Sequence, residues 1–118
     1  MNDSASQDPV TTDPGLYRVV FENARVRVLE YRDDPGDATH VHGHPDSVMV
    51  TLSSFSRVIA ADGDEVPVRM PAGQVRWLDA QEHAGRNVGT TPTHSIFVEL
   101  KEPSPVSSRP ARLGPSPS

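Results

Sequence analysis

Short apolar runs separated by turn-forming residues constrain the fold of this chain more than any other feature of its sequence. In residues 25–31 (RVRVLEY), valines alternate with arginines, so the two kinds of side chain point to opposite sides of an extended chain. A period of two residues is the pattern of a half-buried strand, and we expect the arginines on its solvated face. Dense turn signals follow at residues 33–37 (DDPGD) and 61–65 (ADGDE). The pattern therefore predicts strands joined by tight turns.

The same pattern predicts an all-β fold. Apolar residues at i, i+3, i+4 and i+7 are always interrupted by glycine or proline, so we expect no helix. Many short strands with turn signals at regular spacing are typical of a sandwich or barrel. Residues 85–89 (GRNVG) and 90–93 (TTPT) are predicted to be loops. The predicted strands cover residues 16–21, 25–31, 39–44, 47–52, 55–60, 66–70, 75–78 and 94–100.

One folded unit accounts for the 118 residues, and both ends differ from it in composition. Residues 1–14 contain one large apolar residue after Met1, and residues 103–118 contain five of the 12 prolines and five serines. Such segments bury too little apolar surface to offset the entropy lost on ordering. We therefore expect a disordered N-terminal segment over residues 1–14, a domain over 15–102, and a Pro/Ser-rich disordered tail over 103–118.

The composition argues against several classes of protein. The chain has no cysteine, which rules out disulfides, thiolate metal sites and a cysteine nucleophile. A net charge of −5 without a basic stripe argues against nucleic acid as a partner. No apolar run approaches the roughly 20 residues that span a bilayer, and the first residues lack a signal-peptide pattern. We expect a cytoplasmic protein that binds neither nucleic acid nor membrane.

The histidines are spaced in a way that suits a metal site. His40, His42 and His44 alternate along a predicted strand, and His83 and His94 follow later. Side chains two apart on a strand share a face and stand roughly 7 Å apart, so two imidazoles can bind one ion. A third ligand must then come from a neighbouring strand. Neutral imidazole suits zinc, iron(II), nickel and copper. By itself the spacing fits ordinary hydrogen-bonded histidines equally well.

The residues around these histidines resemble the two-part motif of the cupin family. Gly36, five further residues and His42-Gly43-His44 are similar to the first half of that motif. Pro71-Ala72-Gly73 and the later run of residues 83–87 (HAGRN) are similar to the second half. The resemblance covers residues 16–101. It implies a jelly-roll double-stranded β-helix in which the strands of the two half-motifs face each other across a barrel mouth. It also implies metal ligands at His42, His44 and His83, and a structural turn formed by Asn87 and Gly89.

Two departures from the family pattern affect the predicted chemistry. The family's glutamate ligand would fall at Val48 or Met49, so that carboxylate is missing. Nine residues, rather than two, separate Gly73 from His83. Three neutral histidines leave the charge of a divalent ion uncompensated and at least one coordination position open, which makes a good Lewis acid. We expect the bound ion to be zinc, with iron(II) or nickel as alternatives.

Further residues are candidates for a site beside the metal. Glu99 and Glu82 are candidate catalytic acids or bases. Glu99 would be a buried acid if its strand face lines the barrel, whereas Glu82 also fits an exposed loop. Trp77, the single tryptophan, fits either the core or the pocket. The candidate pocket residues are His40, Tyr31, Ser47, Met49 and Trp77, with Thr51 and Arg57 as further members.

A narrower resemblance suggests an activity. Residues 44–49 (HPDSVM) and 76–83 (RWLDAQEH) are similar to the zinc-binding cupin domain of hydrazine synthetases. That family implies rearrangement of an amino-acid ester of an N-hydroxylated amine to form an N–N bond, and a synthetase-like partner domain or protein. Alternatives are a three-histidine iron(II) dioxygenase and a non-catalytic metal- or ligand-binding cupin. We expect a metal-dependent enzyme that acts on a small polar metabolite, and the cupin resemblance implies a homodimer.

Overall fold

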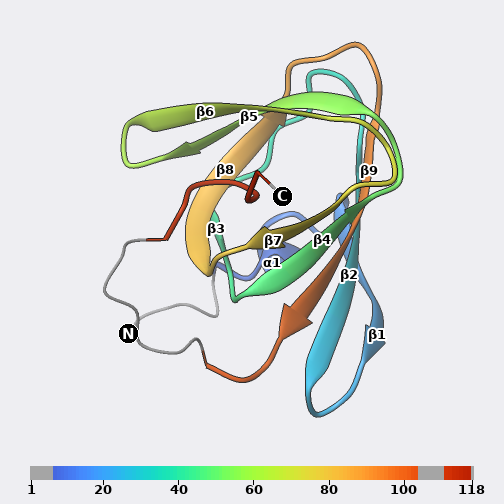
Figure 1. The fold of residues 1–118 in the computed structure, drawn as a ribbon, viewed down its shortest axis with the longest axis vertical. Helices are drawn as coiled ribbons and strands as arrows, with labels where there is room; N and C mark the ends of the chain where they lie inside the picture. Colours follow the sequence, from blue (N-terminus) through green and yellow to red (C-terminus); the bar gives the residue numbers. More distant parts are fainter. Residues whose placement is uncertain (1–6, 104–110, 118) are drawn as a thin grey trace.

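The computed structural model describes residues 7–103 and 111–117, and its strands form two antiparallel sheets that enclose one core (Figure 1). One sheet has the strand order β1-β2-β9-β4-β7, and the other has the order β3-β8-β5-β6. The predicted all-β fold is confirmed. The elements in chain order are α1 (Pro9–Thr12), β1 (Tyr17–Glu22), β2 (Val26–Asp33), β3 (His42–His44), β4 (Ser47–Thr51), β5 (Phe55–Ala61), β6 (Asp64–Met70), β7 (Val75–Leu78), β8 (Gln81–Asn87) and β9 (Thr93–Leu100).

Strand β8 is the main difference from the predicted secondary structure. Its sequence, QEHAGRN, contains few apolar residues, and part of it was expected to be a loop. It forms a strand because β3 pairs with its first half and β5 with its second half, so each half has a hydrogen-bonded neighbour. The inward positions at His83, Gly85 and Asn87 are buried. A central strand can therefore be polar when its inward side chains have partners.

The pairing of β3 with β8 also corrects the expected placement of the two half-motifs. The strands that carry them were expected to face each other across a barrel mouth. Instead they are neighbours in one sheet, and His42 lies directly opposite His83 in the register. The expectation that the third histidine comes from a neighbouring strand is confirmed.

The terminal segments are ordered where the structure describes them, which differs from the expected disorder. Residues 9–12 form the short helix α1, capped by the side chain of Asp8 and begun by Pro9. Residues 111–117 lie beside β7 and β8 (Figure 1). Polar contacts hold both segments to the barrel, and the N-terminal one is also held by apolar packing, since Pro9 is buried and Val10 packs against the core. Residues 1–6, 104–110 and 118 lie outside the described residues.

The core is formed by side chains from both sheets. In β2 the face that carries Arg27 points inward, whereas it was expected to point to solvent. Leu29, Tyr31 and Asp33 are buried on the inward face of β2, and Arg27 shares that parity. Arg27 is inward because two carboxylates receive its guanidinium. The buried apolar residues of the core are Tyr17, Leu29, Tyr31, Met49, Phe55, Met70, Leu78 and Phe97.

The outer face of the five-stranded sheet is apolar as well. The strand register places five side chains in one row across it: Phe21, Val28, Val98, Val48 and Trp77. Trp77, expected in the core or the pocket, is 38% exposed on this outer face, and its indole Nε1–H donates to Asp79. The alternation along β7 explains this, because Leu78 takes the inward position. Among the described residues there is no helix with the length and apolar character that a membrane crossing requires.

Candidate metal centre

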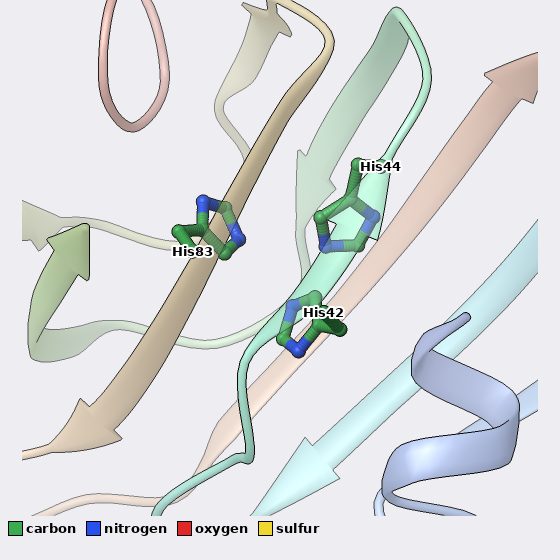
Figure 2. A group of neighbouring side chains, drawn as sticks. All are labelled: His42, His44 and His83. Carbon is green, nitrogen blue, oxygen red and sulfur yellow. The ribbon is translucent and has the colours of Figure 1, made fainter. Parts of the chain in front are cut away.

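Three buried histidines meet on the inward side of β3 and β8 (Figure 2). His42 and His83 are register partners, and His44 follows two residues after His42 on the same face. The ring centroids lie 4.7 Å apart for His42 and His44, 5.0 Å for His42 and His83, and 5.1 Å for His44 and His83. One candidate ligand atom from each residue lies within 4.8 Å of the others. The three side chains could therefore hold one metal ion.

Each of the three rings is oriented by an acceptor at Nδ1. Nδ1 of His42 lies 2.9 Å from the carbonyl oxygen of His40, and Nδ1 of His44 lies 3.2 Å from Oε2 of Glu99. Nδ1 of His83 lies 2.7 Å from Oε1 of Gln81. Because carbonyl and carboxylate oxygens only accept, each Nδ1 carries the proton and donates. This leaves Nε2 of all three rings with a free lone pair, the arrangement of a metal-ligating histidine.

Nε2 of His44 and Nε2 of His42 have surroundings that suit a ligand. Nε2 of His44 is buried and has no hydrogen-bond partner among residues 7–103 and 111–117. Such an orphaned atom is costly unless something outside the chain satisfies it. Nε2 of His42 has one distant neighbour, the hydroxyl of Tyr17 at 3.5 Å. An ion at this point would satisfy the lone pairs that the chain leaves open.

Burial keeps His42 and His83 uncharged. Removal from water, and then the proximity of His44, lowers the pKa of His42 to about 4 and that of His83 to about 2. Both rings are therefore neutral at neutral pH, which is the form that binds a metal ion. No proton has to leave these two side chains before an ion can bind.

The cluster borders a small cavity of about 50 Å³ inside the barrel. His42 and His83 line one part of it, and Arg57 lines another. Most of the remaining wall is apolar, formed by Met49, Phe55, Ile59, Val68, Leu78 and Phe97. A ligand in this space would meet imidazole and guanidinium groups in a cavity whose other walls are largely apolar.

Arg57 is held in a buried polar network. Its guanidinium pairs with the Asp33 carboxylate and donates to the Tyr31 hydroxyl at 3.1 Å. Tyr31 also donates to Asp33, and the Asn87 side-chain amide donates to Asp33 at 3.0 Å. Burial favours a neutral Asp33, but the hydrogen bond from Tyr31 and the charge of Arg57 lower its pKa overall. The network keeps the guanidinium charged and fixed beside the cavity. Asn87 and Gly89 form the expected turn, since the Gly89 N–H donates to the Asn87 side chain at 3.0 Å.

The two candidate catalytic acids lie outside the cavity wall. Glu99 is buried, but it sits behind His44, with Oε2 toward the ring and Oε1 accepting from Arg27 at 3.0 Å. It orients a histidine instead of facing a substrate. Glu82 alternates with His83 on β8, so it points outward and is exposed, opposite Gly43 of β3. Glu82 is therefore not among the residues that line this cavity, and its part in the site stays a prediction.

The candidate pocket residues divide into three groups. Tyr31 and Met49 line the cavity. Ser47 is fully buried on the inward side of β4, but it is not among the residues that line this cavity. His40 and Trp77 do not reach the cavity. His40 precedes β3, its side chain is 79% exposed, and its Nδ1 contacts Asp13 at 2.9 Å.

Sequence reasoning missed three functional neighbours of the cluster: Tyr17, Asp33 and Gln81. Tyr17 stands near the start of the predicted strand 16–21, where parity is hard to assign, and Asp33 was placed in the predicted turn of residues 33–37. Gln81 has the same parity as His83, two residues before it, and the inward face of β8 was the signal that could have found it. The loop prediction for part of β8 hid that signal.

Comparisons with known proteins bear on the fold. No protein-family model and no curated protein matches the chain. A cupin domain from Bordetella pertussis is 26% identical, with a TM-score of 0.69 over 74% of this chain and 93% of that one. A conserved protein with a double-stranded β-helix domain from Klebsiella pneumoniae is 19% identical, with a TM-score of 0.59 over 85% of this chain and 88% of that one. An RmlC-like cupin family protein from Methanocaldococcus jannaschii is 9% identical, with a TM-score of 0.58 over 72% of this chain and 78% of that one. This chain therefore has the cupin double-stranded β-helix fold, with a three-histidine group that could hold a metal ion.

Proposed function

We propose that this protein is a metal-dependent cupin enzyme that binds one divalent transition metal at His42, His44 and His83, with zinc as the expected ion. The observation that carries the proposal is the orientation of the three rings. Every Nδ1 is engaged, Nε2 of His44 has no partner among the described residues, and Nε2 of His42 has only the distant Tyr17 hydroxyl. A merely structural histidine cluster has no need of a buried Nε2 without a partner.

The donor set fits a borderline ion such as zinc better than magnesium or calcium. The group offers neutral nitrogen donors, and within the described residues the metal-type cluster contains no carboxylate. An ion bound there would keep its full positive charge and act as a Lewis acid toward an oxygen or nitrogen of a substrate. The Tyr17 hydroxyl is placed to donate a hydrogen bond to that substrate, because it lies 3.5 Å from Nε2 of His42.

The cavity favours a small metabolite with few polar groups. Its wall is largely apolar, and Arg57 supplies a fixed positive charge for an anionic or carbonyl group. The guanidinium is already neutralised by Asp33, so we expect it to orient a substrate more than to attract one.

The sharpest version of this proposal is N–N bond formation. It rests on the resemblance of two segments to the cupin domain of hydrazine synthetases, and it requires a synthetase-like partner domain or protein to supply an amino-acid ester of an N-hydroxylated amine. Incubation of zinc-loaded protein with such an ester, followed by mass spectrometry, tests it. A hydrazine product that disappears in His42→Ala supports the assignment, and simple hydrolysis of the ester contradicts it.

Elemental analysis of the purified protein is the decisive experiment for the metal. We expect about one zinc per chain. Iron together with oxygen uptake would instead favour the three-histidine dioxygenase. A bound metal without turnover would favour a binding role. A preparation that contains no metal and takes up neither zinc, iron nor nickel would refute the proposal. The homodimer and the cytoplasmic location stay predictions, and molar mass from light scattering tests the first.

A further inference from the structure

The C-terminal segment, residues 111–117, crosses the cavity that contains the histidine cluster. On one side Ser116 exchanges hydrogen bonds with Trp77, its N–H donating to the Trp77 carbonyl at 2.8 Å and its Oγ accepting from the Trp77 N–H at 3.2 Å. On the other side, the place of a Cβ at Gly114 lies 3.6 Å from Cγ2 of Val68 and 4.0 Å from Cγ1 of Ile59. Gly114 and Pro115 are part of the cavity wall. The segment therefore reaches from β7 to the β5–β6 hairpin.

The size of the closed cavity shows what the segment excludes. About 50 Å³ holds roughly three or four water molecules, whereas pockets for small metabolites usually measure about 300–1,000 Å³. With Gly114 and Pro115 in its wall, the cavity has room for only a few heavy atoms. Displacement of the C-terminal segment would enlarge this space.

Gln81 links this segment to a metal-site histidine. Its Oε1 accepts from the Gly114 N–H at 2.9 Å and from Nδ1 of His83 at 2.7 Å. Its Nε2 donates to the carbonyl oxygens of Arg112 and Asp79, both at 2.8 Å. The Gly114 N–H can only donate and the two carbonyls can only accept, so the orientation of the amide is fixed. One side-chain amide thus holds both the closed segment and the tautomer of His83.

We propose that residues 111–117 are a lid over the histidine cavity and that Gln81 is a positioning residue which couples closure of the lid to the orientation of His83. The coupling to a bound metal rests on the function proposed above, whereas the lid itself does not. Hydrogen bonds are worth about 1 kcal/mol each, so a segment held largely by them opens at a modest cost. The lid then sets which ligands enter and how firmly His83 is oriented.

The first test measures access to His83 in the metal-free protein. Gly114 has φ +78°, which proline cannot adopt, so Gly114→Pro removes both the lid conformation and the N–H that binds Gln81. Arg112→Ala is the matched control, because Gln81 and Asp79 contact only the backbone of Arg112. We expect diethyl pyrocarbonate, mapped by mass spectrometry, to modify His83 about tenfold faster in Gly114→Pro than in the unmodified chain or in Arg112→Ala. The rate at exposed His40 should not change, and the thermal midpoint should fall by only a few degrees.

Two results overturn the lid. One is an unchanged rate at His83 in Gly114→Pro. The other is a rise at His83 that comes with loss of the cooperative thermal transition, because access would then reflect unfolding of the barrel.

The second test addresses the coupling through Gln81. Nitrogen-15 spectra of the metal-free protein report the tautomer of His83, and amide exchange reports closure at Gly114. In Gln81→Met we expect His83 to populate both neutral tautomers instead of the Nδ1–H form alone. We also expect amide exchange at Gly114 to be about tenfold faster. Gln81→Glu keeps both acceptor contacts and should restore the tautomer. A tautomer unchanged in Gln81→Met overturns the coupling.

The third test uses the metal alone. Transfer of zinc to a chelator should be about tenfold faster in Gly114→Pro than in Arg112→Ala. Equal transfer rates overturn the coupling to the metal. If zinc does not bind to any variant, the proposed function fails, while the results of the two metal-free tests still decide the lid.

Discussion

Glu99 accepts a hydrogen bond from Nδ1 of His44 at 3.2 Å in the interior of the barrel. The other oxygen of Glu99 accepts from Arg27, whose guanidinium also donates to Asp8 at the cap of α1. A series of contacts thus runs from the N-terminal segment to a metal-site histidine. His42 is held in a comparable way, through the carbonyl of His40, whose own N–H donates to Asp13 at 3.0 Å.

We predict that Glu99→Gln weakens zinc binding about 10-fold to 100-fold, the usual effect of losing an outer partner of a metal-ligating histidine. The charge of Glu99 strengthens the donor character of His44, and the amide does not replace it. Competition with a chelator measures the affinity. Glu102→Gln is the control, because that acid is exposed and pairs with Arg25. Equal affinities in the two variants would contradict the role given to Glu99.

We predict that His42→Ala or His83→Ala lowers metal occupancy by at least about 100-fold, whereas His40→Ala changes it by less than about threefold. The reason for the difference is that His40 contributes its carbonyl oxygen to the site, and that oxygen remains after the side chain is removed. Elemental analysis after dialysis checks the occupancies. Equal losses of metal occupancy in all three variants would contradict the assignment of His42 and His83 as ligands.

The buried network around Asp33 should be sensitive to loss of either charge. We predict that Asp33→Asn or Arg57→Met costs about 3–5 kcal/mol in the free energy of unfolding, because each leaves an uncompensated buried charge. Urea unfolding measures it. Arg86→Met breaks an exposed pair with Glu65 and should cost less than about 1 kcal/mol. If Asp33→Asn costs less than about 1 kcal/mol, the network is open to water.

Glu30 gives the fold a defined dependence on pH. The hydrogen bond from His94, and then those from Arg18 and Arg32, lower the pKa of Glu30 from 4.5 to about 2. Since the folded pKa lies below the unfolded one, the stabilisation is complete above about pH 4.5 and disappears as the pH falls toward 2.

We therefore predict that Glu30→Gln costs about 1–2 kcal/mol in the free energy of unfolding at pH 7 and almost nothing near pH 2. Urea unfolding across this range, with Glu102→Gln as an exposed control, measures the difference. The expected loss of stability is modest because Arg18 and Arg32 are largely exposed to water. A cost that is the same at both pH values would contradict the role given to Glu30.

Local patterns predicted the parts of the fold that depend on neighbours along the chain. Alternation placed most strands, and Asp62 with Gly63 does form the β5–β6 turn, both with positive φ. The alternating positions of His42 and His44 put both rings on one face, because side chains two apart on a strand always share a face. The two-part motif added His83. The sequence by itself therefore determined the all-β fold and the members of the histidine cluster.

Long-range pairing decided the rest. The polar run of β8 is a strand only because β3 and β5 pair with it, and Arg27 faces inward only because Asp8 and Glu99 meet it there. The two flanking segments have few apolar residues, so their order depends on capping, on polar contacts with the finished barrel, and on the packing of Pro9 and Val10 against its core. The acceptor behind His44, Glu99, comes from β9 and was likewise chosen by tertiary structure. Each of these contacts joins groups whose meeting depends on how the whole sheet is assembled, and no local pattern in the sequence encodes it.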